Sequence, residues 1–137
     1  MKRRKPAGER GGPPRNPAKR PVPSIAIKRV YEKPGGDDGV RVLIDRLWPR
    51  GVSKAELRLD AWPRVLSPST ELRKWYAHDP RHFAEFRLRY RGELAAHGDE
   101  LAALRTMIRG RAATLLTATR ELDLSHAVIL REVLESG

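Results

Sequence analysis

The distribution of apolar residues predicts two short strands near the start of the chain. Apolar and polar positions alternate in "SIAIKRVYE" (residues 24–32), the period-two pattern of a strand with one buried face. The run "VRVLIDRL" (residues 40–47) is almost continuously apolar, which is typical of a strand covered on both faces. The breaker cluster "KPGGDDG" between them is expected to be a loop, and Pro49 and Gly51 are expected to end the second strand.

Capping residues predict where three helices begin. Ser53 is expected to cap a short helix, with Glu56 completing a capping box. Ser69 or Thr70 is expected to cap a second helix. Asp79, which a proline follows, marks the start of a third.

The third helix is predicted to carry a buried stripe, and Gly98 is expected to end it. The stripe consists of residues that recur at helical spacing: Phe83, Phe86, Tyr90, Leu94 and His97. A further helix is predicted from residue 99 to about residue 108, with apolar residues again at helical spacing.

The end of the chain predicts a buried strand in "RAATLLTAT" (residues 111–119) and a last helix in "SHAVILREVLE" (residues 125–135). This helix is expected to bury Ala127, Leu130, Val133 and Leu134. The order of strand, strand, several helices, strand and helix indicates a small α/β domain, with a central sheet and helices packed against it.

Charge changes this picture at the N-terminal end. The chain has a formal net charge of +11, and residues 1–23 hold eight Lys/Arg and one acid, so most of the excess lies there. This Pro/Gly-rich segment lacks the apolar content to fold, so we expect a disordered basic tail followed by one domain over residues 24–137. Such a tail either binds nucleic acid nonspecifically through phosphates or is a solubilising extension.

Composition also excludes several classes of protein. No apolar run is long enough to span a membrane, the N-terminus lacks the apolar core of a secretory signal, and cysteine is absent, so we expect a cytoplasmic protein. The glycine-rich stretches fit neither a P-loop nor a dinucleotide fingerprint, so no cofactor is expected. His78 and His82 are four residues apart but lack a third ligand, so no metal site is predicted.

The first candidate site follows the second predicted strand and consists of Asp45, Arg46, Trp48 and Arg50. Ligands of open α/β sheets collect at the carboxyl ends of strands, and an arginine offers a bidentate fork to a carboxylate or phosphate. Neighbouring residues of a regular strand point to opposite faces, so Asp45 and Arg46 are not both expected to reach one ligand. In the alternative interpretation, Asp45 forms an ion pair with an arginine and Trp48 covers the sheet edge.

The second candidate site follows the third predicted strand. Asp123 or Ser125 is expected to cap the last helix, whose free amides and dipole favour an anion. Arg120 lies in the preceding loop. His126 is in the first helical turn, where the neutral imidazole is favoured and can exchange a proton near neutral pH. In the alternative interpretation, His126 only packs against the sheet.

Three stretches of the sequence resemble the DUF488 family, in particular its short YeaO-like branch. They are "IKRVY…GVRVLIDRLWPRGVSK", "LSPSTELRKWYAHDPRHFAEFRLRYRGEL" and "TLLTATRELDLSHAVILREVL", and together they cover about residues 25–135. The resemblance implies a small three-layer α/β domain with a short, mainly parallel central sheet. It implies little about function, since the family has no established one.

The resemblance also bears on chemistry. The family's longer branch carries cysteines at the positions of Thr117 and Ser125 and retains the histidine at His126, an arrangement similar to rhodaneses and cysteine phosphatases. This chain has no cysteine, so chemistry that needs a thiolate nucleophile is excluded. The YeaO-like branch usually has a basic residue at Arg120, an acid at Glu121 and asparagine where Ser125 stands here.

Three hypotheses about function follow. In the first, the two candidate sites form one pocket for an anionic small molecule, walled by Trp48 and Trp75; if it is catalytic, His126 is the acid/base. In the second, the motif residues form a buried ion-pair network in a structural or interaction module. In the third, the tail and an arginine-rich face bind nucleic acid. The arginines of that face are Arg58, Arg64, Arg81, Arg87, Arg89 and Arg91.

Overall fold

The core of the fold is a three-stranded parallel sheet. The computed structural model describes residues 25–136, so the prediction of a basic tail lies outside the described residues. The strands are β1 (Ile25–Arg29), β2 (Val40–Leu43) and β3 (Ala113–Thr117), in the order β1-β3-β2. The central strand pairs in parallel with both neighbours, and the predicted small α/β domain is confirmed.

Five α-helices and three short 3₁₀ helices complete the described part of the chain. In order they are α1 (Lys54–Leu57), η1 (Arg64–Leu66), α2 (Thr70–Tyr76), η2 (Pro80–His82), α3 (Phe83–Ala95), α4 (Gly98–Ile108), η3 (Leu122–Leu124) and α5 (His126–Ser136). The caps at Ser53 and Ser69 are confirmed: Ser53 forms a capping box with Glu56, and the Ser69 hydroxyl accepts from the backbone of α2. Asp79 caps the 3₁₀ turn η2, and α3 follows it directly from Phe83.

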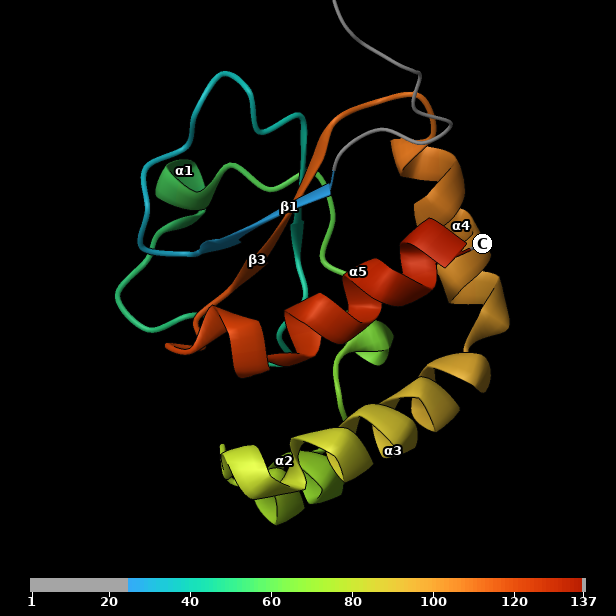
Figure 1. The fold of residues 1–137 in the computed structure, drawn as a ribbon. Coiled ribbons are helices and arrows are strands. Elements are labelled where there is room, and N and C mark those ends of the chain that lie inside the picture. Colours follow the sequence, from blue (N-terminus) through green and yellow to red (C-terminus); the bar gives the residue numbers. More distant parts are fainter. Residues whose placement is uncertain (1–24, 137) are drawn as a thin grey trace, which may run out of the picture.

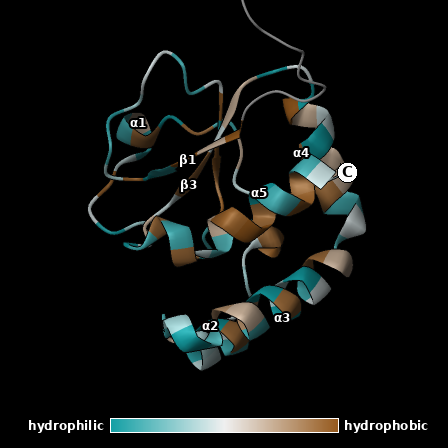
Figure 2. Ribbon diagram, in the orientation of Figure 1, coloured by the Kyte–Doolittle hydropathy of each residue, from teal (hydrophilic) through white to brown (hydrophobic). Residues whose placement is uncertain are grey.

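The sheet has a thick layer on one face and a thin layer on the other. Because strand side chains alternate, Val42 and Leu115 belong to the larger core, together with buried residues of α2, α3, α4 and α5. Leu43 and Leu116 face the other side, where Leu57 of α1 and the loop tryptophans cover them. Figure 1 shows α5 running across the strands, with α3 and α4 beyond it and α1 set apart from them. Hydrophobic residues of β2 and α5 belong to the same larger core, and Figure 2 shows hydrophobic segments along α5.

The predicted stripe of α3 is confirmed except at its end. Phe86, Tyr90 and Leu94 are buried, and the Phe86 ring stacks on Tyr76 with centroids 4.1 Å apart. The prediction that His97 packs in the core and that Gly98 ends the helix is wrong. The helix ends at Ala95, the side chain of His97 is 40% exposed, and Gly98 opens α4, where acidic residues of the first turn favour a new helix start.

The first two strands are shorter than predicted. β2 ends at Leu43, although the Ile44 N–H still donates to Leu116 O at 3.0 Å. Beyond this bond, Asp45 turns to the end of β3, so the regular strand stops. β1 ends at Arg29, which leaves Tyr31 51% exposed. None of the helices in the described range is long and apolar enough to cross a membrane.

Candidate functional site

The strand order places the two candidate sites at one edge of the sheet. β2 and β3 are adjacent and parallel, so the segments that follow them leave from the same edge. A pocket of about 710 Å³ lies there, within the usual range for small-molecule sites. Seven residues proposed from the sequence line it: Asp45, Arg46, Trp48, Arg50, Arg120, Ser125 and His126. The predicted convergence of the two segments is therefore what the structure has.

Asp45 joins the ends of the two strands. Its Oδ1 accepts from the Thr117 hydroxyl at 2.7 Å, and its Oδ2 accepts from the Ala118 N–H at 2.8 Å. His126 Nε2 lies 3.1 Å from Oδ1. Burial raises the pKa of Asp45. The hydrogen bond and charge of His126, followed by the hydrogen bonds from Ala118 and Thr117, lower the pKa by more than burial raises it, so it lies below its usual value. Among residues 25–136 no arginine pairs with Asp45, and His126 occupies the position that the alternative interpretation gave to an arginine.

His126 and Ser125 fix the start of α5. His126 Nε2 also lies 3.0 Å from Ile44 O, and its ring meets Tyr90 edge to face with centroids 6.1 Å apart. The Ser125 hydroxyl accepts from the Ala127 N–H and donates to Leu122 O, so Ser125 rather than Asp123 is the cap. Both side chains line the pocket. The Ser125 hydroxyl and the His126 Nε2 already have partners within the protein.

Arg46 is held against the pocket wall without a carboxylate. Its Nε donates to Pro68 O at 3.3 Å and its Nη2 to Ser67 O at 3.2 Å. The side chain is half-buried, and among the described residues it forms no ion pair. The expectation that Asp45 and Arg46 point to opposite faces applied to a regular strand; β2 ends at Leu43, and both residues line the pocket.

The remaining predicted residues form the rim. Trp48 donates from Nε1 to Val52 O at 2.6 Å and packs edge to face on Trp62. Arg50 and Arg120 are exposed, and neither side chain is paired with a carboxylate in the described range. Trp75 was expected to wall the pocket, and this is wrong: its ring stacks on His82 instead, with centroids 4.8 Å apart.

The C-terminal half of α2 contributes a part of the pocket that the sequence did not predict. Arg73 and Lys74 line the pocket, as does His78 just after the helix. The stretch "LRKWYAHDP" contains all three, but its cap, its apolar positions and the spacing of His78 do not indicate that Arg73 and Lys74 line a pocket. The adjacent cations Arg73 and Lys74 are the one signal that this stretch offers.

The two histidines with metal-like spacing have different surroundings. His78 lines the pocket, whereas His82 stacks on Trp75. Within residues 25–136, no group of three or more His, Cys, Asp or Glu side chains is placed to hold a metal ion.

These features define a small α/β protein with parallel strands and a basic pocket at the carboxyl edge of its sheet. The chain belongs to the DUF488 family, since a family model described as the "Inactive DUF488-N3 subclade" matches residues 24–137. It is 44% identical over 110 residues to the uncharacterized protein Rv3073c of Mycobacterium tuberculosis (strain H37Rv). The aligned region covers 80% of this chain and 92% of that protein.

A second relative supports the same assignment. The chain is 41% identical over 113 residues to the uncharacterized protein YeaO of Escherichia coli (strain K12). The aligned region covers 82% of this chain and 98% of that protein. The resemblance to the YeaO-like branch is thereby confirmed. No solved structure is significantly similar to the chain.

Proposed function

We propose that the pocket binds an anionic small molecule that carries a phosphate or carboxylate group. The observation that carries this proposal is the half-buried guanidinium of Arg46, which is bonded to two carbonyls and, within residues 25–136, faces no carboxylate. A cation removed from water normally acquires a counter-charge, and an arginine fork fits a carboxylate or phosphate. An anionic ligand supplies both the charge and the acceptors.

The charge balance of the pocket supports the same proposal. Its basic side chains are Arg46, Arg50, Arg73, Lys74 and Arg120. Two acids line it: Asp45, whose oxygens accept from Thr117, Ala118 and His126, and the exposed Glu121. The excess of positive charge in a concave site raises the local concentration of anions.

The arginine-rich face gives weaker support to nucleic-acid binding, because several of its arginines pair with acidic side chains. Within it, Arg81 pairs with Asp79, and Arg89 pairs with Glu85. Glu132 accepts from Arg87 at 2.8 Å, which reduces the positive field of that face further. The nucleic-acid hypothesis therefore stays a prediction, and a filter-binding titration of the domain without residues 1–23 tests it.

Binding without catalysis is the version of the proposal that the observations favour. The matching family model describes an inactive subclade, and the chain has no cysteine for thiolate chemistry. His126 directs its Nε2 to Asp45 and Ile44 O, so that nitrogen is engaged within the protein. We assign His126 to holding α5 against the end of β2.

Thermal unfolding of the full chain with inorganic phosphate or malonate at constant ionic strength tests the proposal. A ligand at about 100 times its dissociation constant stabilises the folded state by about 2.7 kcal/mol. Phosphate also stabilises proteins through exclusion from their surface, so the comparison between variants is decisive. We expect Arg46→Met to remove the ligand-specific stabilisation.

Arg109→Met is the matched control, because Arg109 is an exposed arginine at the end of α4 that does not line the pocket. It should retain the full shift. Equal shifts in wild type, Arg46→Met and Arg109→Met would show that the anion acts on the surface in general, and would overturn the proposal. In that case the motif residues serve the fold alone, which is the alternative of a structural module.

A further inference from the structure

The pocket is much larger than one small anion, and its basic residues come from two separate parts of the fold. Arg46, Arg50 and Arg120 follow the strand ends, whereas Arg73 and Lys74 belong to α2. Figure 1 shows the body of α2 apart from the strands, and the Arg46 side chain reaches Ser67 O and Pro68 O just before the start of α2. A pocket of about 710 Å³ has room for a ligand larger than one phosphate.

The α2 group is held in a fixed position relative to the strand ends. The Tyr76 hydroxyl donates to Leu124 O at 2.7 Å, which ties the end of α2 to the loop before α5. At the other end of α2, the Ser69 hydroxyl donates to Glu93 of α3 at 2.6 Å. The backbone that carries Arg73 and Lys74 is therefore held in place, so binding has to order only their side chains.

Arg73 and Lys74 have no carboxylate partner in the described part of the chain. Neither forms an ion pair there, and both are exposed on the pocket side. Cations in the last turn of a helix also interact favourably with the helix dipole, so their position in α2 alone assigns nothing. What distinguishes them is that both line the same pocket as Arg46.

The turn after α2 adds His78 to the side of the pocket that Arg73 and Lys74 line. Ala77 and His78 both adopt left-handed backbone conformations, with φ of 48° and 58°. Side chains rarely occupy this region, so the turn is held by its surroundings rather than by local preference. The Ala77 N–H caps α2 through Arg73 O at 3.0 Å, and the exposed His78 that follows lines the pocket.

We propose that the ligand is an organic molecule with two anionic groups at separate points, one held by the strand-end arginines and the other by Arg73 and Lys74. This inference rests on the proposed function, because it divides the same pocket into two anion subsites. The middle of the ligand then lies over the aromatic floor, where Tyr76 stacks on Phe86.

A series of α,ω-alkylbisphosphonates of increasing chain length, titrated into the full chain by calorimetry, measures the separation of the subsites. Alkylphosphonates of the same lengths are the reference, since they share the methylene groups and lack the second charge. We expect one bisphosphonate length to bind about tenfold or more tighter than its monophosphonate, the gain of one additional charged contact.

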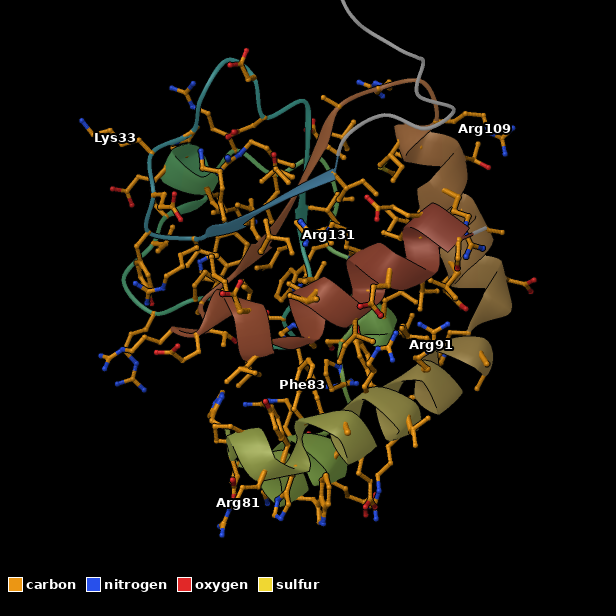
Figure 3. The ribbon with its side chains drawn as sticks, in the orientation of Figure 1. Lys33, Arg81, Phe83, Arg91, Arg109 and Arg131 are labelled. Carbon is orange, nitrogen blue, oxygen red and sulfur yellow. The ribbon has the colours of Figure 1, made fainter. Side chains whose placement is uncertain are left out.

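The double variant Arg73→Ala/Lys74→Ala is expected to bind mono- and bisphosphonates of each length equally, so that the preference for the second charge is lost. Arg109→Ala/Arg111→Ala, which removes the same charge from the exposed end of α4, should keep the preference; Figure 3 shows Arg109 at that end of the molecule, away from α2. Urea unfolding of both variants establishes that each is folded.

The outcomes separate this inference from the proposed function. Equal affinity for mono- and bisphosphonates at every length, abolished by Arg46→Met, overturns the second subsite and leaves the anion pocket. Binding that is insensitive to Arg46→Met, or absent for the whole series, overturns both. A preference that survives in Arg73→Ala/Lys74→Ala overturns the assignment to α2.

Discussion

Two arginines five residues apart have opposite surroundings. Arg41 lies within β2, is 5% exposed, forms an ion pair with Asp38, and donates from Nε and Nη2 to Leu57 O at 2.9 and 2.8 Å. Arg46 lies beyond the strand, donates to two carbonyls, and has no carboxylate partner in residues 25–136. The first positive charge is neutralised inside the protein, and the second remains available to the pocket.

This difference indicates which charge serves the fold. Asp38 also accepts from Lys28 at 3.1 Å and from the Gly35 N–H at 2.9 Å, so the whole Arg41 cluster is satisfied. Burial raises the pKa of Asp38, but its bonds to Gly35, Lys28 and Arg41 lower it below its usual value. No such set surrounds Arg46. The variants below test whether removing each charge affects stability, binding or both.

Arg41→Met is expected to have the largest effect. It removes one partner of a buried ion pair and leaves Asp38 with Lys28 alone, so the free energy of unfolding should fall by about 3 kcal/mol. Urea unfolding monitored by tryptophan fluorescence measures this. Anion affinity of the folded protein should be unchanged. A loss below about 1 kcal/mol would contradict the distinction between the two arginines.

Asp45→Asn should cost about 2 kcal/mol, because an amide cannot accept from Thr117, Ala118 and His126 together. The folded pKa of Asp45 lies below the unfolded value, so the ionised form stabilises the fold above a pH of about 3.9 and this contribution is lost as the pH falls through the folded pKa. The stability difference between wild type and Asp45→Asn should therefore narrow in acid.

Thr117→Val is the control for that pH dependence. It removes one hydrogen bond to Asp45 and keeps the carboxylate with His126, so a loss of about 1 kcal/mol is expected. The loss should vary much less between neutral and acidic pH than the loss in Asp45→Asn. Parallel pH profiles for the two variants would mean that the charge of Asp45 contributes nothing to the join between β2 and β3.

Arg46→Lys separates charge from geometry at the pocket. A lysine keeps the positive charge but cannot bond both Ser67 O and Pro68 O while offering a fork to the ligand. We expect a stability loss of about 1 kcal/mol or less and a drop in phosphate affinity of about tenfold. Calorimetric titration beside Arg46→Met measures it. Full affinity in Arg46→Lys would mean that the pocket responds to charge alone.

The strand pattern favoured the hypothesis that Asp45, Arg46 and His126 lie at one edge of the sheet, and all three line the pocket there. Carboxyl ends of adjacent parallel strands share an edge, so apolar strands followed by polar residues place those residues together. The expectation that Asp45 and Arg46 point to opposite faces assumed a regular strand, and β2 ends before either residue. The strand stops where the Asp45 carboxylate bonds to Thr117 and Ala118 at the end of β3. These partners are 72 and 73 positions away in the sequence.

The α2 side of the pocket was beyond the sequence for a similar reason. Local patterns predicted that α2 exists and where it starts, and the structure agrees. Which wall Arg73 and Lys74 join depends on the bond of the Tyr76 hydroxyl to Leu124 O, 48 residues away. Periodicity shows which face of a helix is buried, but the element that its polar face meets is set by tertiary contacts.

Arg50→Gln should have the smallest effect and sharpens the comparison between half-buried and exposed arginines. Arg50 is exposed at the rim, where its carbonyl rather than its side chain is bonded, to the Tyr31 hydroxyl at 3.3 Å. The free energy of unfolding should change by less than about 0.5 kcal/mol, and phosphate affinity should fall about threefold at low salt. Since exposed charges are screened at about 1 M salt, this difference should disappear there, whereas the effect of Arg46→Met should persist. Phosphate titrations of both variants at two salt concentrations decide the matter, and an equal loss of effect with salt would mean that Arg46 is no more shielded from water than Arg50.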